Sequence, residues 1–235
     1  MRDVKSLLVA YIALMIGCTG SGRTAHVVFI DYTQSASTFR GDNPSKVKEL
    51  LRGLVAKMGP EDLLEVYAIH AYTASASPLL RLRGPELKGD LNDEMRKEAW
   101  MKNTAMPALQ DIWQVDFSED RTSSTNIYPT VRKISRLRKA GYVVKGYVVA
   151  DMIQDFQGED FHNVFSDPGV DPTEHARYKV KEFGFQGVLK GIDVVVKIPG
   201  SPQGNQVYDS VRWKVNEFWE AFFTECGAVV VIEDL

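Results

Sequence analysis

Cysteine is scarce in this chain of 235 residues, which contains only Cys18 and Cys226. Two cysteines provide neither a disulfide framework nor the ligand spacing of a zinc site. The chain also lacks an excess of charge of one sign, since 28 basic and 31 acidic residues leave a formal net charge of −3. We therefore expect no nucleic-acid partner. No glycine-rich phosphate loop and no Ser-His-Asp arrangement is evident, so the sequence identifies no catalytic residue and we expect a binding protein rather than an enzyme.

Long apolar runs are also missing. The apolar run from Leu7 to Ile16 is too short to cross a bilayer, which takes about 20 residues. It follows a short segment containing Arg2 and Lys5, and its length is typical of the apolar region of a signal peptide. The N-terminus therefore predicts export.

The apolar run ends in the sequence LMIGC, whose last residue is Cys18. This segment resembles the lipobox of bacterial lipoproteins, although Met15 stands where leucine is commonest. The resemblance implies a signal peptide over residues 1–17, a lipidated Cys18 and a tether over residues 18–25. The protein would then be anchored in the cell envelope, facing the periplasm or the outside. A secreted protein, or one held by an uncleaved signal anchor, is the alternative.

From residue 26 to residue 235, strand and helix patterns alternate, and the 44% hydrophobic composition suits one large domain. The expected strands cover residues 26–30, 63–72, 77–83, 142–151, 191–199 and 228–233. The expected helices cover residues 44–58, 90–115, 125–141, 174–183 and 206–225, with Asn43 as the N-cap of the first and both Trp213 and Trp219 of the last in the core. Such alternation predicts an α/β fold with a doubly wound, mostly parallel sheet, flanked by helices and with one antiparallel edge strand. Residues 153–173 are expected to form a long acidic loop.

Three segments at strand or helix ends carry oxygen-rich side chains. The first strand runs into DYTQS, which contains Asp31, Thr33 and Ser35; Thr125 opens an expected helix, and Asp151 ends an expected strand. Ligands of open α/β sheets bind beyond the carboxyl ends of the strands, where these loops can lie side by side. Two carboxylates and three hydroxyls suit a hard cation such as Mg²⁺, and the absence of imidazole and thiolate disfavours zinc or copper.

The same segments, DYTQS with Thr125 and Asp151, resemble the metal-ion-dependent adhesion site of von Willebrand factor type A (vWA) domains. MGPEDLLEVYAIH and STNIYPTVRKI extend the resemblance over roughly residues 26 to 233. The family pattern has serine where this chain has Thr33. The resemblance implies that Thr33, Ser35 and Thr125 coordinate one Mg²⁺ or Mn²⁺ directly and that Asp31 and Asp151 act through water. It also implies a protein partner that offers a carboxylate to the ion, with Tyr32 and Gln34 beside the site.

Two other functions remain open on the sequence. An apolar strand followed by Asp-x-Thr also resembles haloacid dehalogenase-like phosphotransferases or phosphatases, in which Asp31 would be the nucleophile and Asp151 with Asp155 would hold Mg²⁺. However, Thr33 replaces the usual second Asp, and no lysine loop is evident. Alternatively, the chain is a metal-free interaction scaffold that uses the acidic loop as its contact surface. As a separate hypothesis, Asp160, His162 and Asp167 of this loop could hold a second cation, although a solvated loop is the simpler interpretation.

Overall fold

The computed structural model describes residues 22–33, 42–114, 124–199 and 206–235. The main sheet contains β1 (Thr24–Asp31), β2 (Leu63–Ile69), β3 (Leu80–Arg83), β4 (Val143–Val149), β7 (Asp193–Ile198) and β8 (Val229–Asp234). The helices are α2 (Asn43–Lys57), α3 (Asp93–Trp100), η2 (Met101–Ala105), α4 (Met106–Gln114), α5 (Thr130–Lys139), α6 (Phe161–Ser166), α7 (Pro172–Phe183) and α8 (Gln206–Glu225). A small hairpin of β5 (Asp155–Phe156) and β6 (Glu159–Asp160) completes the fold.

The strand order of the main sheet is β3-β2-β1-β4-β7-β8. All neighbouring strands are parallel except β3, which runs antiparallel to β2 at the edge. The predicted mostly parallel α/β sheet with an antiparallel edge strand is therefore confirmed. The chain builds outward from β1 in one direction and then from β4 in the other, so the order reverses between β1 and β4.

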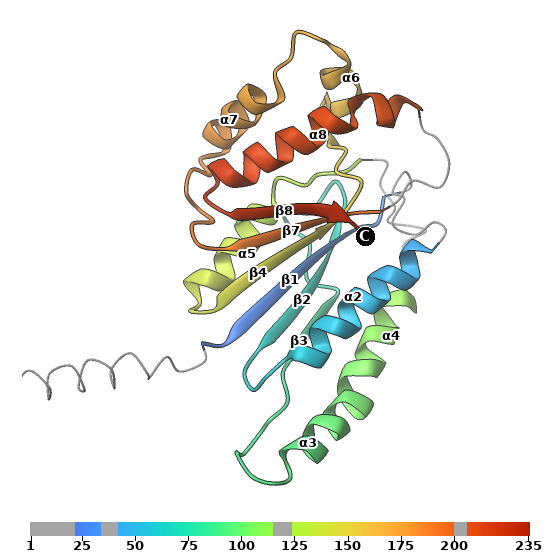
Figure 1. The fold of residues 1–235 in the computed structure, drawn as a ribbon, viewed down its shortest axis with the longest axis vertical. Coiled ribbons are helices and arrows are strands. Elements are labelled where there is room, and N and C mark those ends of the chain that lie inside the picture. The colour runs from blue at the N-terminus through green and yellow to red at the C-terminus, as the bar shows by residue number, and fades with distance from the viewer. Residues whose placement is uncertain (1–21, 34–41, 115–123, 200–205) are drawn as a thin grey trace, which may run out of the picture.

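Helices cover the two faces of the sheet, as Figure 1 shows, with α2 and α4 on one face and α5, α7 and α8 on the other. Side chains of β1 alternate between these layers, as the period of two in a strand requires. Val28 and Ile30 pack towards α2 and α4, whereas Val27 and Phe29 pack towards α5 and α8. All four are fully buried, which explains why the sequence of β1 is continuously apolar.

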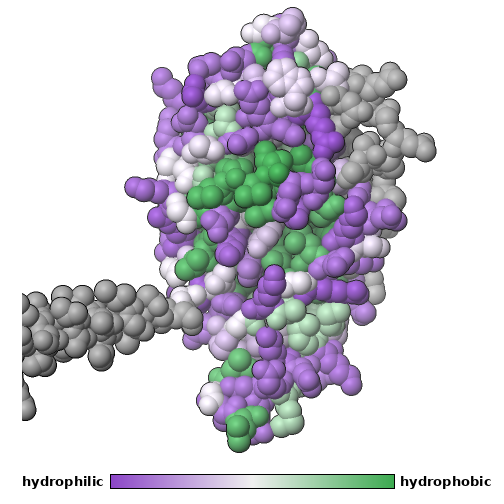
Figure 2. Space-filling view, viewed as in Figure 1, coloured by the Kyte–Doolittle hydropathy of each residue, from purple (hydrophilic) through white to green (hydrophobic). Residues whose placement is uncertain are grey.

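The β8 edge of the sheet is covered on one face only. Val230 and Ile232 pack against the core beneath α8, while Val229 and Val231 are 62% and 51% exposed. Apolar side chains gather over this part of the surface in Figure 2. The flanking of the sheet by helices is therefore complete at β1 and β2 and incomplete at β8.

Several predicted boundaries were wrong, each for a local reason. The second strand stops at Ile69 because the next residues form a turn, in which Thr73 Oγ1 donates to the carbonyl of His70 at 2.6 Å. The N-cap of α2 is Asp42, and Asn43, the predicted N-cap, is the first residue of the helix. The helix predicted over residues 90–115 is interrupted by the wider turn η2, which ends at Ala105, directly before Met106-Pro107. The ring and missing N–H of Pro107, the second residue of α4, disfavour a regular α-helical turn in the residues before it.

The segment predicted to be a long acidic loop is structured. Residues 155–160 form the β5–β6 hairpin, with Gln157 and Gly158 at positive φ in its turn. The side chain of Asp160 then accepts a hydrogen bond from the backbone N–H of His162 and caps α6. Gln157-Gly158 is typical of a hairpin turn and Asp160 is typical of a helix cap, so both features are encoded locally in the sequence.

Candidate metal centre

The two carboxylates of the predicted site, Asp31 and Asp151, lie where the strand order reverses. Asp31 is the last residue of β1, and Asp151 follows β4 by two residues. The two strands are hydrogen-bonded neighbours, with Ile30 paired to Val149, so their exit loops leave the sheet side by side. A crevice opens at such a switch point because the connections on its two sides diverge to opposite faces of the sheet.

Asp31 is buried and half satisfied. Its side chain is 0% exposed, and its Oδ1 accepts hydrogen bonds from the backbone N–H of Thr33 at 2.9 Å and from Thr33 Oγ1 at 2.8 Å. Its Oδ2 has no hydrogen-bond partner among the residues that the structure describes. Leaving a buried carboxylate oxygen without a partner is costly, so this atom marks a place where a cation would be stabilising.

Thr125 joins the first loop from a distant part of the chain. Its Oγ1 donates to Thr33 Oγ1 over 3.2 Å, and both threonines are nearly fully buried. The sequence predicted that Thr125 opens a helix. This prediction was wrong, because α5 begins only at Thr130. Instead Thr125 forms an isolated β-bridge with Asp155, with N–O distances of 2.9 and 3.0 Å. This bridge ties the Thr125 loop to the loop that carries Asp151.

Two contacts that the sequence did not reveal position the Asp151 loop. The backbone N–H of Ile127 donates to Gln154 Oε1 at 2.8 Å, and Nε1 of the fully buried Trp219 donates to the carbonyl of Met152 at 2.7 Å. Met152 has a φ of 66°, which is unfavourable for a residue with a side chain, so the surrounding contacts must hold it. No pattern of residue spacing could have identified Gln154 or Trp219 as positioning residues.

Burial makes both carboxylates costly to ionise, and the charge of Asp151 adds to that cost for Asp31. Burial, and then the negative charge of Asp151, raises the pKa of Asp31 to about 7. Burial is also the largest cause that raises the pKa of Asp151 to about 6, although Asp151 Oδ1 accepts a hydrogen bond from the N–H of Ile153 at 3.0 Å. Both acids thus have raised pKa values, although the nearby His162 acts to lower that of Asp151, and a bound divalent cation would favour their ionised forms.

The available ligand atoms fit a hard cation. Among the described residues, no three His, Cys, Asp or Glu side chains are grouped so that they could hold a metal ion. The described oxygen donors of this site are the carboxylates of Asp31 and Asp151 and the hydroxyls of Thr33 and Thr125. Mg²⁺ and Mn²⁺ favour oxygen donors of this kind. Ser35, Gln34 and Cys18 lie outside the described residues. Tyr32, expected beside the site, is 4% exposed and packs in the core between the sheet and α2.

The alternative ion sites are not formed by the described side chains. Asp155 is exposed, and it contacts Thr125 through its backbone. Asp160 caps α6, while Asp167 accepts from the N–H of Gly169 beyond the other end of that helix. The second cation site suggested by Asp160, His162 and Asp167 is therefore wrong, because these acids satisfy backbone groups at opposite ends of α6.

This chain is similar to known proteins in structure rather than in sequence. No family model matches the chain, and no curated protein matches it in sequence. Solved structures do match. Two of them are vWA proteins. The VWA2 paralog of ArnB from Sulfolobus acidocaldarius is 12% identical at a TM-score of 0.45, over 91% of this chain and 41% of that one.

The second, a von Willebrand factor type A protein from Catenulispora acidiphila, is 12% identical at a TM-score of 0.45, over 90% of this chain and 39% of its own. Proximal thread matrix protein 1 from the mussel byssus, solved with a zinc-occupied MIDAS motif, is 11% identical at a TM-score of 0.37, over 87% and 46% of the two chains. This chain thus spans less than half the length of each of these vWA and MIDAS proteins. The candidate metal centre is therefore argued from the residues of this chain and not from these similarities.

No helix among the described residues has the length and apolarity needed to cross a membrane.

The remaining cysteine, Cys226, is fully buried, and burial raises the pKa of its thiol to about 12. The thiolate is therefore suppressed at neutral pH, and Cys226 is a core residue rather than a reactive one.

Proposed function

We propose that this protein binds one Mg²⁺ or Mn²⁺ at the loops of Asp31, Thr33, Thr125 and Asp151, together with Ser35, and uses the ion to hold a carboxylate of a protein partner. The observation that carries the proposal is the fully buried carboxylate of Asp31, which has an oxygen without a hydrogen-bond partner among the described residues. A second acid and two hydroxyls surround it. Removing two carboxylates from water is expensive unless a positive charge compensates them.

The residues of the site would supply two kinds of oxygen ligand, charged and neutral. Asp31 and Asp151 supply negative charge, and the hydroxyls of Thr33 and Thr125 supply neutral oxygen atoms. A bound ion would contribute an electrophilic position that can accept an oxygen from outside the protein. Because two of the oxygen donors are neutral, the ion would keep more of its positive charge than in a site made of carboxylates alone. That excess is the physical reason for expecting an acidic group on the partner.

Acceptance of a carboxylate can be tested with acetate as the probe. Bound Mn²⁺ enhances the relaxation of water protons, so the full chain in mild detergent should enhance it in proportion to site occupancy. Added acetate is expected to reduce the enhancement by displacing metal-bound water, while an equal concentration of acetamide leaves it unchanged. Acetate that leaves the enhancement unaltered would contradict the proposed mode of binding.

We favour a binding role over phosphotransfer with Asp31 as the nucleophile. Thr33 donates twice to Asp31 Oδ1, so this oxygen is occupied, and no lysine or arginine contributes to the pKa of Asp31, whereas phosphoryl transfer commonly uses such a cationic side chain beside the transferred group. Hydrolysis of p-nitrophenyl phosphate by the Mg²⁺-loaded chain, lost in Asp31→Asn and retained in Thr125→Val, would favour phosphotransfer instead.

We further propose that Cys18 is lipidated and anchors the protein in a bacterial cell envelope, with the metal centre facing away from the cytoplasm. The support is the LMIGC segment after a charged and then apolar N-terminus. Expressed in a bacterium with radiolabelled palmitate, the wild type is expected to carry label and sediment with membranes, and Cys18→Ser to lose the label and accumulate as precursor. Equal labelling of both proteins would refute lipidation at Cys18.

A further inference from the structure

A cavity of about 410 Å³ opens beside the metal centre, between the start of α5, the β5–β6 hairpin and the end of α7. This volume lies within the usual range of small-molecule sites, whereas well-packed interiors leave few voids larger than a water molecule. Its floor includes Asn126 and Gln154, which belong to the two loops that the Thr125–Asp155 bridge joins. The segment predicted to be an acidic loop thus supplies one wall of a pocket.

Aromatic rings form one side of the cavity. The ring of Tyr128 lies 4.8 Å from that of Phe183, which in turn lies 5.5 Å from that of Phe185, measured between centroids. Phe156, at the end of β5, is half-buried and lines the cavity as well. Such a wall offers a flat apolar ligand both buried area and ring contacts.

The charges that line the cavity leave a positive excess. Lys179 Nζ lies 3.4 Å from Glu159 Oε1 and 3.1 Å from Glu182 Oε2, so one lysine serves both acids. Glu159 Oε1 also lies 2.8 Å from His175 Nε2. The two acids that line the cavity thus share one lysine, and Arg132 and Lys133 bring the lining to an excess of one positive charge.

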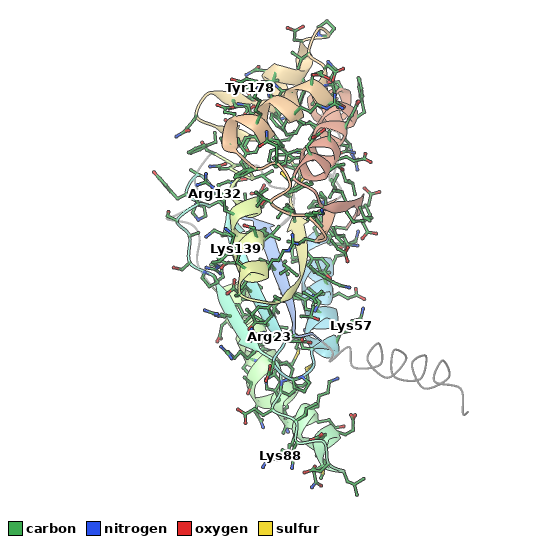
Figure 3. The ribbon with its side chains drawn as sticks, turned by 90° about the vertical axis from the view of Figure 1, so that its left-hand side faces the viewer. Arg23, Lys57, Lys88, Arg132, Lys139 and Tyr178 are labelled. Atoms are coloured by element: carbon green, nitrogen blue, oxygen red, sulfur yellow. The ribbon has the colours of Figure 1, made fainter. Side chains whose placement is uncertain are left out.

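Arg132 and Lys133 have no such partners. The Arg132 guanidinium lies 5.5 Å from the centre of the Phe185 ring, and it forms no ion pair with any carboxylate of the described residues. Lys133 Nζ donates to the carbonyl of Ala76 at 2.7 Å, which is a neutral acceptor. In Figure 3, Arg132 projects from α5 on the side towards α7, where Tyr178 is labelled, whereas Lys139 lies at the far end of α5.

We propose that this cavity binds a monocarboxylate with an aromatic body, whose ring packs on the Tyr128–Phe183–Phe185 wall and whose carboxylate meets Arg132. A singly charged acid matches the positive excess, while the nearby Glu159 and Glu182 disfavour a dianion such as a phosphate monoester. A free aromatic acid and the C-terminal aromatic residue of a peptide would both present this chemistry. The proposal does not depend on a metal ion.

The test is a titration of the full chain in mild detergent with phenylacetate, followed by ¹H–¹⁵N NMR. We expect shifts at the backbone amides around residues 126–133 and 179–185 and a Kd on the order of 1 mM, typical of so small a ligand. Arg132→Gln is expected to weaken binding about fivefold or more, and the uncharged isostere phenylacetamide to bind the wild type about as weakly. Lys139→Gln, which also removes one positive charge from the same helix but outside the cavity, should leave the Kd unchanged.

Equal affinity of the wild type and Arg132→Gln for phenylacetate, or shifts only at amides away from the cavity, would overturn the proposal. Thr125→Val should retain phenylacetate binding, which separates this site from the metal centre. Tighter binding of N-acetylphenylalanine than of phenylacetate would identify the end of a peptide as the source of the ligand, and weaker binding would identify a free acid.

Discussion

Asp31→Asn is expected to stabilise the metal-free protein at pH 8 by about 2 kcal/mol, with about 4 kcal/mol as the upper bound, and to abolish its stabilisation by Mg²⁺. The pKa of Asp31 is raised in the fold to about 7 from an ordinary value of 3.8. An acid with a raised pKa favours folding while it is protonated, and that contribution is lost as the pH rises from about 4 to about 7. Asparagine carries no charge and so avoids the loss.

Urea denaturation in EDTA at pH 5 and pH 8, repeated with Mg²⁺, measures this effect. The wild type should lose stability between the two pH values in EDTA and regain it with Mg²⁺ at pH 8, whereas Asp31→Asn should show a smaller change in both comparisons. Asp111→Asn, at an exposed position of α4, is the matched control and should behave as the wild type does. A destabilised Asp31→Asn protein in EDTA at pH 8 would contradict the assigned environment of Asp31.

Trp219→Ala is expected to lower the free energy of unfolding by about 3–5 kcal/mol, the largest effect of any single change discussed here. Trp219 is fully buried among Phe218, Phe222 and Phe223 of the same helix and contacts the ring of Tyr128 at 5.4 Å. The substitution would leave a large cavity in this cluster. It would also leave the carbonyl of Met152 without its donor, and so release the loop that carries Asp151.

Trp219→Phe partly separates these two contributions, since it keeps an aromatic ring while it removes the donor to Met152 and the second ring of the indole. We expect it to cost about 1–3 kcal/mol in urea denaturation and to weaken Mn²⁺ binding as well. Trp213→Ala is the control on the same helix, because Trp213 is 59% exposed, and it should change stability by less than about 0.5 kcal/mol. A Trp219→Phe protein that is as stable as the wild type would show that the hydrogen bond to Met152 contributes nothing.

The sheet could be predicted because its strands are strongly patterned. β1 is buried on both faces, so it appears in the sequence as one apolar run that ends at Asp31. The antiparallel edge strand β3 was also predicted, although it is only four residues long. The burial of individual side chains was harder to predict, because it depends on tertiary contacts. The expected packing of Trp213 in the core was wrong, since Trp213 lies on the exposed side of α8 while Trp219 is buried.

The candidate site was predictable in its residue types and less so in its supports. Asp31 and Asp151 follow central strands, which is where ligands of such sheets bind, so their proximity could be inferred from order alone. Thr125 was expected to open a helix, and it lies instead in a β-bridge, because residues 124–129 first pair with the loop after β4. Long-range hydrogen bonds such as those of Gln154 and Trp219 leave no periodic trace in a sequence.

The measurement that tests the metal centre most directly is calorimetric titration of Mn²⁺ and Mg²⁺ into the full chain, compared with Thr125→Val and Thr130→Val. Both threonines are buried and undergo the same change, but Thr125 Oγ1 contacts Thr33 whereas Thr130 Oγ1 has no partner among the described residues. We expect one ion per chain with a Kd of about 1 mM or tighter, at least about tenfold weaker binding in Thr125→Val, and wild-type binding in Thr130→Val. Wild-type affinity in Thr125→Val, or no binding by a folded wild type, would contradict the assignment.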